Sequence, residues 1–407
     1  MRILKVVDGE YPWDVRVEKV CAALSDRGHK VHMVARNRDR RALREELAEA
    51  TMHRLKPWPW LGSAGDAASQ FPAFFNPRWY SLIHRTTREV GASAIIVRDI
   101  PLAPTAIRAA HASGIPCVLD MAENYPAMIR DLWTTRSTKF GDFLVRNPKA
   151  VEAVERWVLR RIDHVLVVVE ESKARLEAEL NVSPERITVV SNTPSVSRLE
   201  TGADSDAGET RGWSQDHPLI IGYLGVMETA RGVGLVIDAV AAAREEGVPV
   251  ELELIGDGRA LPEFRRQAAS LGLDESVVRV HGFRPYQEAL EIIRACHAGA
   301  IPHFANESWE TTIPNKLFDY MSLGIPVVAS SVSPVKRVLE ETGAGWTFQD
   351  RSVADLTRLI VDMARTKDLA AAGGAGQAAI RQKYNWERDS ARLYEAIEAL
   401  QLQGASL

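Results

Sequence analysis

A lysine lies at the start of an expected helix in the stretch Thr311–Ser331, which reads TTIPNKLFDYMSLGIPVVASS. Pro314 favours the first turn of a helix, and apolar residues at helical spacing follow it until Gly324. The first turn of a helix presents unpaired N–H groups and the positive end of the helix dipole, which attract a phosphate. Lys316 opposes that dipole at a cost of about 0.3–1 kcal/mol, so an anion between the two explains its position.

A second cation, Arg231, lies in the turn after a strand expected earlier in the chain. The segment GVMETARG, Gly225–Gly232, joins a strand at Leu219–Leu224 to a helix that begins at Val233. A guanidinium binds phosphate through two parallel hydrogen bonds, whereas an ammonium acts as a point charge. If the fold brought Arg231 and Lys316 to one helix start, the two would form a compact anion site.

The run PNKLFDYMSLGIPVVAS resembles the donor-binding helix of the retaining GT-B glycosyltransferases of family 4. The resemblance implies that Asp319 holds the ribose hydroxyls of a sugar nucleotide. It also implies that the helix start, with Pro314 and Asn315, faces the diphosphate, and that Arg231 and Lys316 contact it.

The chain departs from this family pattern at one donor position. The pattern has an acid eight positions before the residue at Asp319, and this chain has Thr311 there. A subset of relatives carries Thr or Ser before Pro-Asn-Lys. The sugar contact thus falls on Thr311, Thr312 or Glu310, and all three remain open.

Two further turns are expected beside the donor. The strand Val250–Ile255 ends in Gly256 of an IGDG turn, which resembles the corresponding strand end of the family. The loop after the strand Val277–Val280 carries Phe283 and Arg284, and the resemblance implies that one of them stacks on the nucleobase.

The first half offers fewer candidates. Gly9 follows the first strand and allows a backbone to approach closely. Arg16 is interpreted either as a phosphate ligand or as part of a solvated helix face. Asp120 and Glu123 follow another strand, where ligands of open α/β sheets bind. The resemblance implies an Asp-x-His-Glu motif here with Glu123 as the acidic partner, but Ala122 replaces the histidine, and turn capping is the other interpretation.

Strands alternating with helices predict two Rossmann-like α/β domains. The dinucleotide fingerprint is absent after the first strand, which disfavours a dehydrogenase. The expected domains are 1–198 on the acceptor side, a linker at 199–217, a nucleotide-sugar domain at 218–384 and a final helix at 385–407. The resemblance implies the GT-B fold, with the domains facing across a cleft and the final helix crossing back to the first.

Bulk properties exclude several classes of protein. A formal net charge of −4 gives no global attraction to nucleic acid. Three widely spaced cysteines predict a reducing compartment and neither disulfides nor structural zinc. The N-terminus does not resemble a signal peptide, and no apolar run reaches the roughly 18 residues of a membrane span. A cytoplasmic protein is expected, and Asp204-Ser205-Asp206 is interpreted as linker rather than as a metal motif.

The segment 57–88 is rich in Trp, Phe, Tyr and Arg and is expected to be a long loop with short helical pieces. Such a segment favours peripheral contact with the inner face of a membrane, binding of an amphiphilic acceptor, or a satellite core under the loop.

The resemblance implies transfer of a sugar from a nucleotide diphosphate-sugar to a glycan, lipid-linked or small-molecule acceptor, with retention at the anomeric carbon. The cations and N–H groups would stabilise the departing diphosphate, so neither a metal nor another cofactor is expected. Three alternatives remain: an epimerase or phosphorylase on the same scaffold, a non-catalytic subunit that binds nucleotide sugar, and a protein that binds no nucleotide.

Overall fold

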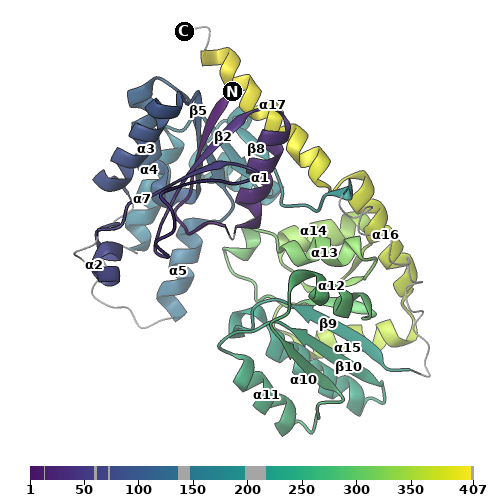
Figure 1. Ribbon diagram of the computed structural model, residues 1–407. Helices are drawn as coiled ribbons and strands as arrows, with labels where there is room; N and C mark the ends of the chain where they lie inside the picture. The colour runs from purple at the N-terminus through teal and green to yellow at the C-terminus, as the bar shows by residue number, and fades with distance from the viewer. Residues whose placement is uncertain (13, 59–61, 72–73, 136–146, 198–216, 405–407) are drawn as a thin grey trace. The chain divides into compact units, whose positions relative to one another are not determined.

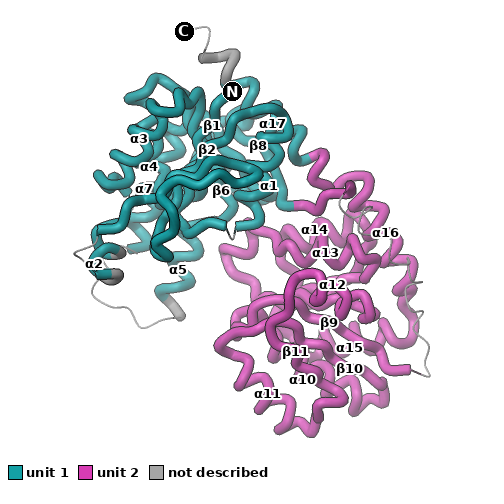
Figure 2. The backbone as a smooth tube through the Cα atoms, viewed as in Figure 1, with its two compact units in different colours: residues 1–192, 389–407 teal, residues 193–388 magenta. Residues whose placement is uncertain are grey.

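The computed structural model describes the chain apart from residues 13, 59–61, 72–73, 136–146, 198–216 and 405–407. The described residues form two compact units, which Figure 2 shows in different colours. Unit 1 comprises residues 1–192 and 389–407, and unit 2 comprises residues 193–388. Nearly all of the expected linker at 199–217, with Asp204-Ser205-Asp206, lies outside the described residues.

Unit 1 is built on an eight-stranded sheet with the order β3-β4-β2-β1-β5-β6-β7-β8 (Figure 1). Neighbouring strands are parallel except for the antiparallel pair β3–β4. β3 and β4 were not expected, because the first is a short charged run. The strands are β1 (Arg2–Val6), β2 (Lys30–Ala35), β3 (Arg44–Glu46), β4 (Thr51–Arg54), β5 (Ala94–Arg98), β6 (Cys117–Met121), β7 (His164–Val167) and β8 (Ile187–Val189).

Helices lie on both faces of this sheet. Figure 1 shows α3, α4 and α7 together on one face and α1 with α17 on the other. Buried aliphatic side chains of the central strands and of α3, α4 and α7 form the core between them. The helices are α1 (Val15–Asp26), α2 (Gly62–Ala68), α3 (Pro77–Val90), α4 (Asp99–Ser113), α5 (Tyr125–Thr135), α7 (Pro148–Leu159), α8 (Glu170–Leu180) and the short η2 (Pro184–Arg186).

The segment 57–88 differs from the expected loop because most of its second half is the long helix α3. Asn76 caps this helix by accepting from the backbone N–H groups of Arg78 and Trp79, and Pro77 occupies its first turn. Asparagine at the N-cap and proline in the first turn are both common at the start of a helix. The helix ends at Gly91, which has a φ of 61°.

Unit 2 is built on a six-stranded, fully parallel sheet with the order β11-β10-β9-β12-β13-β14. The chain reverses its winding between β9 and β12, and ligands of open α/β sheets bind outside the carboxyl ends of the strands at such a point. The strands are β9 (Leu219–Leu224), β10 (Val250–Ile255), β11 (Val278–Gly282), β12 (Ala298–Ile301), β13 (Val327–Ser330) and β14 (Gly345–Phe348).

The helices of unit 2 pack around two clusters of buried apolar residues. One cluster lies mainly between the sheet and α10, α11 and α15, and the other involves α12, α13, α14 and α16. The helices are η3 (Thr229–Arg231), α10 (Val233–Glu245), α11 (Leu261–Ser270), α12 (Tyr286–Arg294), η4 (Trp309–Thr311), α13 (Asn315–Ser322), α14 (Ser333–Thr342), α15 (Val353–Arg365) and α16 (Leu369–Gln382).

The last helix, α17 (Trp386–Gly404), begins in unit 2 and continues in unit 1, which confirms the expected crossover. Within unit 1 the hydroxyl of Tyr394 donates to the carbonyl oxygen of Ala23 on α1 over 3.0 Å. Arg27 and Glu398 form an ion pair of 3.1 Å between the same two helices. None of the described helices is long and apolar enough to cross a membrane.

Candidate functional site

Lys316 lies in the first turn of α13, at the carboxyl end of β9. Its ammonium nitrogen is 4.0 Å from the ring centroid of Tyr223. The same nitrogen lies only 2.7 Å from the position that a Cβ on Gly225 would take, so a side chain there would displace it. Burial lowers the pKa of Lys316 well below its ordinary value, and the charge of Arg231 lowers it further. Among the described residues, Lys316 forms no ion pair with an acid.

Arg231 ends the short helix η3 in the turn after β9. Its guanidinium carbon lies 4.6 Å from the ring centroid of Trp309, and no ion pair to an acid is found for it in the described parts of the chain. The next residue, Gly232, has a φ of 73°, and a Cβ on it would come within 1.8 Å of the carbonyl oxygen of Pro302. Glycine is therefore needed to bring the turn that carries Arg231 against the end of β12.

The start of α13 is open to an anion. Pro314 is the N-cap residue, and no side chain caps the first N–H groups of the helix. Asn315 is exposed at the first helical position. The structure therefore places Lys316 at an uncapped helix start, within reach of the charge of Arg231, which contributes to lowering the pKa of Lys316.

Asp319 lies one turn further along α13. Its Oδ1 accepts a hydrogen bond of 2.7 Å from the hydroxyl of Tyr286, the first residue of α12. The ring of Tyr286 is 55% exposed. Sequence reasoning did not identify Tyr286, although its position three residues after Phe283 in an aromatic loop was a signal.

The three candidates for the sugar contact already have hydrogen-bond partners. Oε2 of Glu310 accepts from the backbone N–H of Ser333, the first residue of α14, over 3.1 Å. The hydroxyl of Thr312 donates to the carbonyl oxygen of Ser308 over 3.0 Å, and that of Thr311 lies 3.3 Å from the same oxygen. Both threonines are buried.

The expected nucleobase loop is exposed. Phe283 is 76% exposed and Arg284 is also on the surface, so both are accessible to a ligand. Gly256 has a φ of 134°, and a Cβ there would lie 1.9 Å from the carbonyl oxygen of Gly225. This close approach joins the ends of β9 and β10.

His303 is a residue of this region that sequence reasoning missed. It follows the end of β12, and its side chain is fully buried. Its ring centroid lies 4.2 Å from that of Trp309. Within the described residues, neither ring nitrogen has a hydrogen-bond partner. Burial, followed by the charges of Lys316 and Arg231, lowers the pKa of His303 well below its ordinary value.

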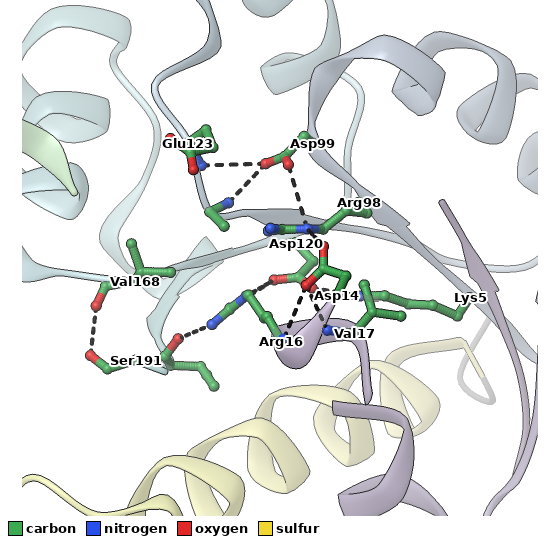
Figure 3. Close-up of polar contacts among 12 residues, drawn as sticks. Lys5, Asp14, Arg16, Val17, Arg98, Asp99, Asp120, Glu123, Val168 and Ser191 are labelled. Carbon is green, nitrogen blue, oxygen red and sulfur yellow. Dashed lines mark hydrogen bonds and ion pairs between the residues drawn. The ribbon is translucent and has the colours of Figure 1, made fainter. Parts of the chain in front are cut away.

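In unit 1 the candidate residues belong to a buried network of charges, which Figure 3 shows around Asp120. Asp120, on β6, is fully buried between the ammonium of Lys5 at 2.5 Å and the guanidinium of Arg16 at 2.7 Å. Burial alone would raise the pKa of Asp120, but Arg16, Lys5 and Arg98 together hold it well below its ordinary value.

Arg16 is therefore not on a solvated helix face. It is 3% exposed, and it also donates to the carbonyl oxygen of Val190 over 2.7 Å. A role at a phosphate stays a prediction, and these contacts do not support it. Asp120 likewise holds the network together from inside the sheet rather than standing open to a ligand.

Glu123 is exposed at the rim of the same network. Its backbone N–H and that of Ala122 point to Oδ1 of Asp99, at 3.3 and 2.9 Å (Figure 3). Asp99 has a φ of 53° and therefore occupies the left-handed region, which non-glycine residues seldom adopt. Asp99 thus caps this turn through its side chain, and the role of the Glu123 side chain, as the acidic partner or in capping, stays a prediction.

Gly9 lies at the carboxyl end of β1, and its carbonyl oxygen accepts from the backbone N–H of Arg36 over 2.9 Å. A Cβ on Gly9 would touch only Val7, at 3.8 Å, so the backbone there has room beside it. Gly9, Arg16 and Glu123 thus lie in unit 1, whereas Arg231, Lys316 and Asp319 lie in unit 2. No group of acids, histidines or cysteines suited to hold a metal occurs in the described part of the chain.

The aromatic segment is divided between core and surface. Trp79 is fully buried in the core of unit 1. Trp58, Phe71 and Phe75 are each about two-fifths exposed, at 38, 40 and 42%. An arginine guanidinium lies over each of these rings, with Arg78 4.3 Å from Trp58, Arg36 5.2 Å from Phe71 and Arg108 5.6 Å from Phe75.

Solved structures with this architecture cover the whole chain. Sucrose-phosphate synthase from Thermosynechococcus elongatus superimposes with a TM-score of 0.71 at 15% identity, over 98% of this chain and 99% of that one. HepE from Anabaena, solved in complex with UDP, gives a TM-score of 0.70 at 16% identity, over 98 and 100%. The likeness shows that the chain has the GT-B fold.

Sequence comparisons agree with the fold. D-inositol 3-phosphate glycosyltransferase from Streptomyces scabiei is 26% identical over 265 residues, which are 62% of this chain and 57% of the relative. The chain spans about half the length of the curated relatives it matches. A family model described as "Glycosyl transferase 4-like domain" matches residues 14–193, and one described as "Glycosyl transferases group 1" matches residues 218–366. Together these matches cover most of the chain, which belongs to the glycosyltransferases that combine a 4-like domain with a group 1 domain.

Proposed function

We propose that the protein transfers a sugar from a nucleotide diphosphate-sugar to an acceptor, with retention at the anomeric carbon. The observation that carries this proposal is the pair Lys316 and Arg231, two cations without an acidic ion-pair partner among the described residues, at the switch point of the unit 2 sheet. Both side chains are partly buried, and a partly desolvated charge without a partner is costly, so the arrangement is best explained by an anionic ligand that completes it.

The arrangement suits the chemistry of the leaving group. The diphosphate gains negative charge as the bond to the sugar breaks, and cations fixed in advance stabilise that charge at little cost in reorganisation. Lys316, Arg231 and the N–H groups of α13 supply this stabilisation, so we propose that transfer needs no metal. Asp319 would hold the ribose, and Phe283 or Arg284 would stack on the base.

The acceptor is proposed to be a glycan, a lipid-linked sugar or a small molecule that binds unit 1. The partly exposed side chains of Trp58, Phe71 and Phe75, each with an arginine over its ring, support an amphiphilic acceptor or contact with a membrane surface. Glu123, exposed at the carboxyl end of β6, is the proposed polar contact on this side.

A non-catalytic nucleotide-sugar-binding subunit is the second candidate. Oε2 of Glu310 accepts from the start of α14, and Thr311 and Thr312 donate to carbonyl groups, so each of the three candidates already has a partner in the free protein. A transferase would have to use a threonine or Oε1 of Glu310, or change these contacts when the donor binds.

The test begins with thermal unfolding in the presence of UDP-, GDP-, TDP- and ADP-sugars, each with and without magnesium. A ligand that binds only the folded state raises the melting temperature by mass action. We expect one base to give a clear rise that does not depend on magnesium. That donor is then incubated with and without acceptor mixtures, and products are identified by mass spectrometry. Conversion without acceptor would indicate an epimerase, binding without conversion would favour the non-catalytic subunit, and absence of any shift would contradict the proposal.

A further inference from the structure

His303 is a buried imidazole whose hydrogen-bonding groups are unused. The ring is fully buried after β12, and in the described residues neither nitrogen finds a partner. A neutral imidazole always carries one N–H donor and one acceptor nitrogen. Leaving a buried donor unpaired costs a protein free energy, so each such group in a native structure calls for an explanation.

The surroundings of the ring identify the kind of partner. Burial, followed by the charges of Lys316 and Arg231, lowers the pKa of His303 well below its ordinary value, so the imidazole is neutral in the free protein. Its ring packs on Trp309 at 4.2 Å, and the guanidinium carbon of Arg231 lies 4.6 Å from the same Trp309 ring. Three groups with unused donor capacity therefore gather where β9 and β12 end, and an anion is the ligand that satisfies all three.

We propose that His303 donates its ring N–H to the diphosphate of the donor, as a third ligand beside Lys316 and Arg231. The inference rests on the proposed function and adds a residue and a role to it. The imidazole acts without carrying charge, so it can contribute a hydrogen bond between two cations without adding to their repulsion. Because the bond from a donor to an anionic oxygen strengthens as negative charge develops there, His303 would favour departure of the diphosphate.

Trp309 explains how the ring is fixed in place. It contacts both His303 and Arg231, and its backbone N–H donates to Oδ1 of Asn306 over 2.8 Å. The backbone of His303 is also fixed, because its carbonyl oxygen accepts from the hydroxyl of Ser330 on β13. The imidazole is thus held by packing on one side and by its main chain on another, while its nitrogens have no hydrogen-bond partner among the described residues.

The test compares three variants by calorimetric titration with UDP, GDP, ADP and TDP in magnesium-free buffer. H303F and H303M remove both nitrogens while keeping an apolar side chain that packs on Trp309, and H303Q restores one N–H donor. We expect the nitrogen-free variants to lose at least about tenfold in affinity for the nucleoside diphosphate that the wild type binds, and H303Q to recover part of that loss. Binding of the corresponding nucleoside, which has no phosphate, should be unchanged in all three.

The outcomes separate this inference from the proposed function. If the wild type binds none of the four diphosphates, the proposed function fails. If the wild type binds one of them and H303F and H303M bind it equally well, the role of His303 fails while the donor site stands. A loss confined to the nucleotide sugar, with the diphosphate unaffected, would assign His303 to the sugar and overturn the proposal.

A measurement on the unmodified protein covers the case in which the nitrogen-free variants do not fold. The ring resonances of His303 are followed by NMR as a function of pH, with and without the diphosphate. We expect its pKa to rise on binding, because the anion offsets the charges of Lys316 and Arg231. An unchanged titration in the bound state would contradict contact with the diphosphate.

Discussion

The hydroxyl of Tyr286 donates a hydrogen bond of 2.7 Å to Oδ1 of Asp319, linking the first residue of α12 to the middle of α13. Partial desolvation of its hydroxyl raises the pKa of Tyr286, and the charge of Asp319 and the hydrogen bond to it raise that pKa further. The hydroxyl therefore stays protonated at physiological pH and remains a donor. One carboxylate oxygen of Asp319 is fixed by this bond, which orients the group proposed to hold the ribose.

Replacing Tyr286 by phenylalanine should weaken nucleotide binding with little change in stability. The substitution removes one hydrogen bond to a charged group, so we expect a loss of about tenfold in affinity for the nucleoside diphosphate. Calorimetric titration measures the loss, and a cycle with Asp319→Asn tests the coupling, since D319N should reduce the effect of Y286F. Additive losses in the double variant would contradict the positioning role. Tyr80→Phe, in unit 1, is the matched control and should bind as the wild type does.

Local signals explain how far the sequence could predict this structure. Apolar runs bounded by turns located most strands, and Pro314 with Gly324 located α13. The partner of Arg16 could not be predicted, because Asp120 stands 104 positions away and is brought to it only by the order of the strands. The burial of His303 against Trp309, near Lys316 and Arg231, could not be predicted for the same reason. By contrast, α3 was not predicted, although Asn76 and Pro77 are typical of a helix start. The aromatic residues of this segment led to the interpretation of a loop with short helical pieces.

Asp120 is predicted to be a stabilising residue of unit 1. In Asp120→Asn the ammonium of Lys5 and the guanidinium of Arg16 would remain buried without their shared carboxylate. Breaking a buried ion pair in this way costs about 3–5 kcal/mol, so urea unfolding should show a loss of that size in the free energy of unfolding. Asp39→Asn is the control, because Asp39 is exposed and lies 3.8 Å from Arg41, and its loss should stay within about 0.5 kcal/mol.

The carboxylate of Asp120 also makes the free energy of unfolding depend on pH. The pKa of Asp120 in the folded protein lies well below the value of about 3.9 in an unfolded chain. Its contribution is complete above the unfolded value and is lost as the pH falls toward the folded one. The difference in unfolding free energy between the wild type and D120N should therefore shrink below about pH 4. A constant difference through this range would contradict a lowered pKa of Asp120 in the folded protein.

Gly232 is predicted to be required for the position of Arg231. Gly232→Ala would place a Cβ 1.8 Å from the carbonyl oxygen of Pro302, on a backbone with a φ of 73°. The turn must move, so we expect a loss of about 1–3 kcal/mol in unfolding free energy and a fall in diphosphate affinity. Gly374→Ala is the matched control, because no atom lies within 4 Å of a Cβ there and the residue is inside α16. The free energy of unfolding of G374A should rise by about 0.5–1 kcal/mol, and the variant should bind the diphosphate as the wild type does. Equal stability changes in both variants would contradict this account.

Lys316 is predicted to stabilise the departing diphosphate at the expense of folding stability. Burial and the charge of Arg231 disfavour its ammonium in the free protein, so Lys316→Met should unfold at the same or a higher urea concentration at pH 7. Turnover, followed as release of nucleoside diphosphate, should nevertheless fall by about 100- to 1,000-fold, the usual effect of removing one such donor. Lys336→Met is the control, because Lys336 is exposed on α14 and pairs with Glu340 at 3.7 Å.

The pH dependence separates this effect of charge from a change in packing. Below its folded pKa, Lys316 is protonated in both the folded and the unfolded chain. Between that pKa and the unfolded value of about 10.4, the unfolded chain binds the extra proton, so Lys316 makes the free energy of unfolding rise with pH. K316M should lack that rise, and the gap between the two proteins should narrow as the pH increases. Parallel profiles, or turnover equal to that of the wild type, would remove Lys316 from the proposed site.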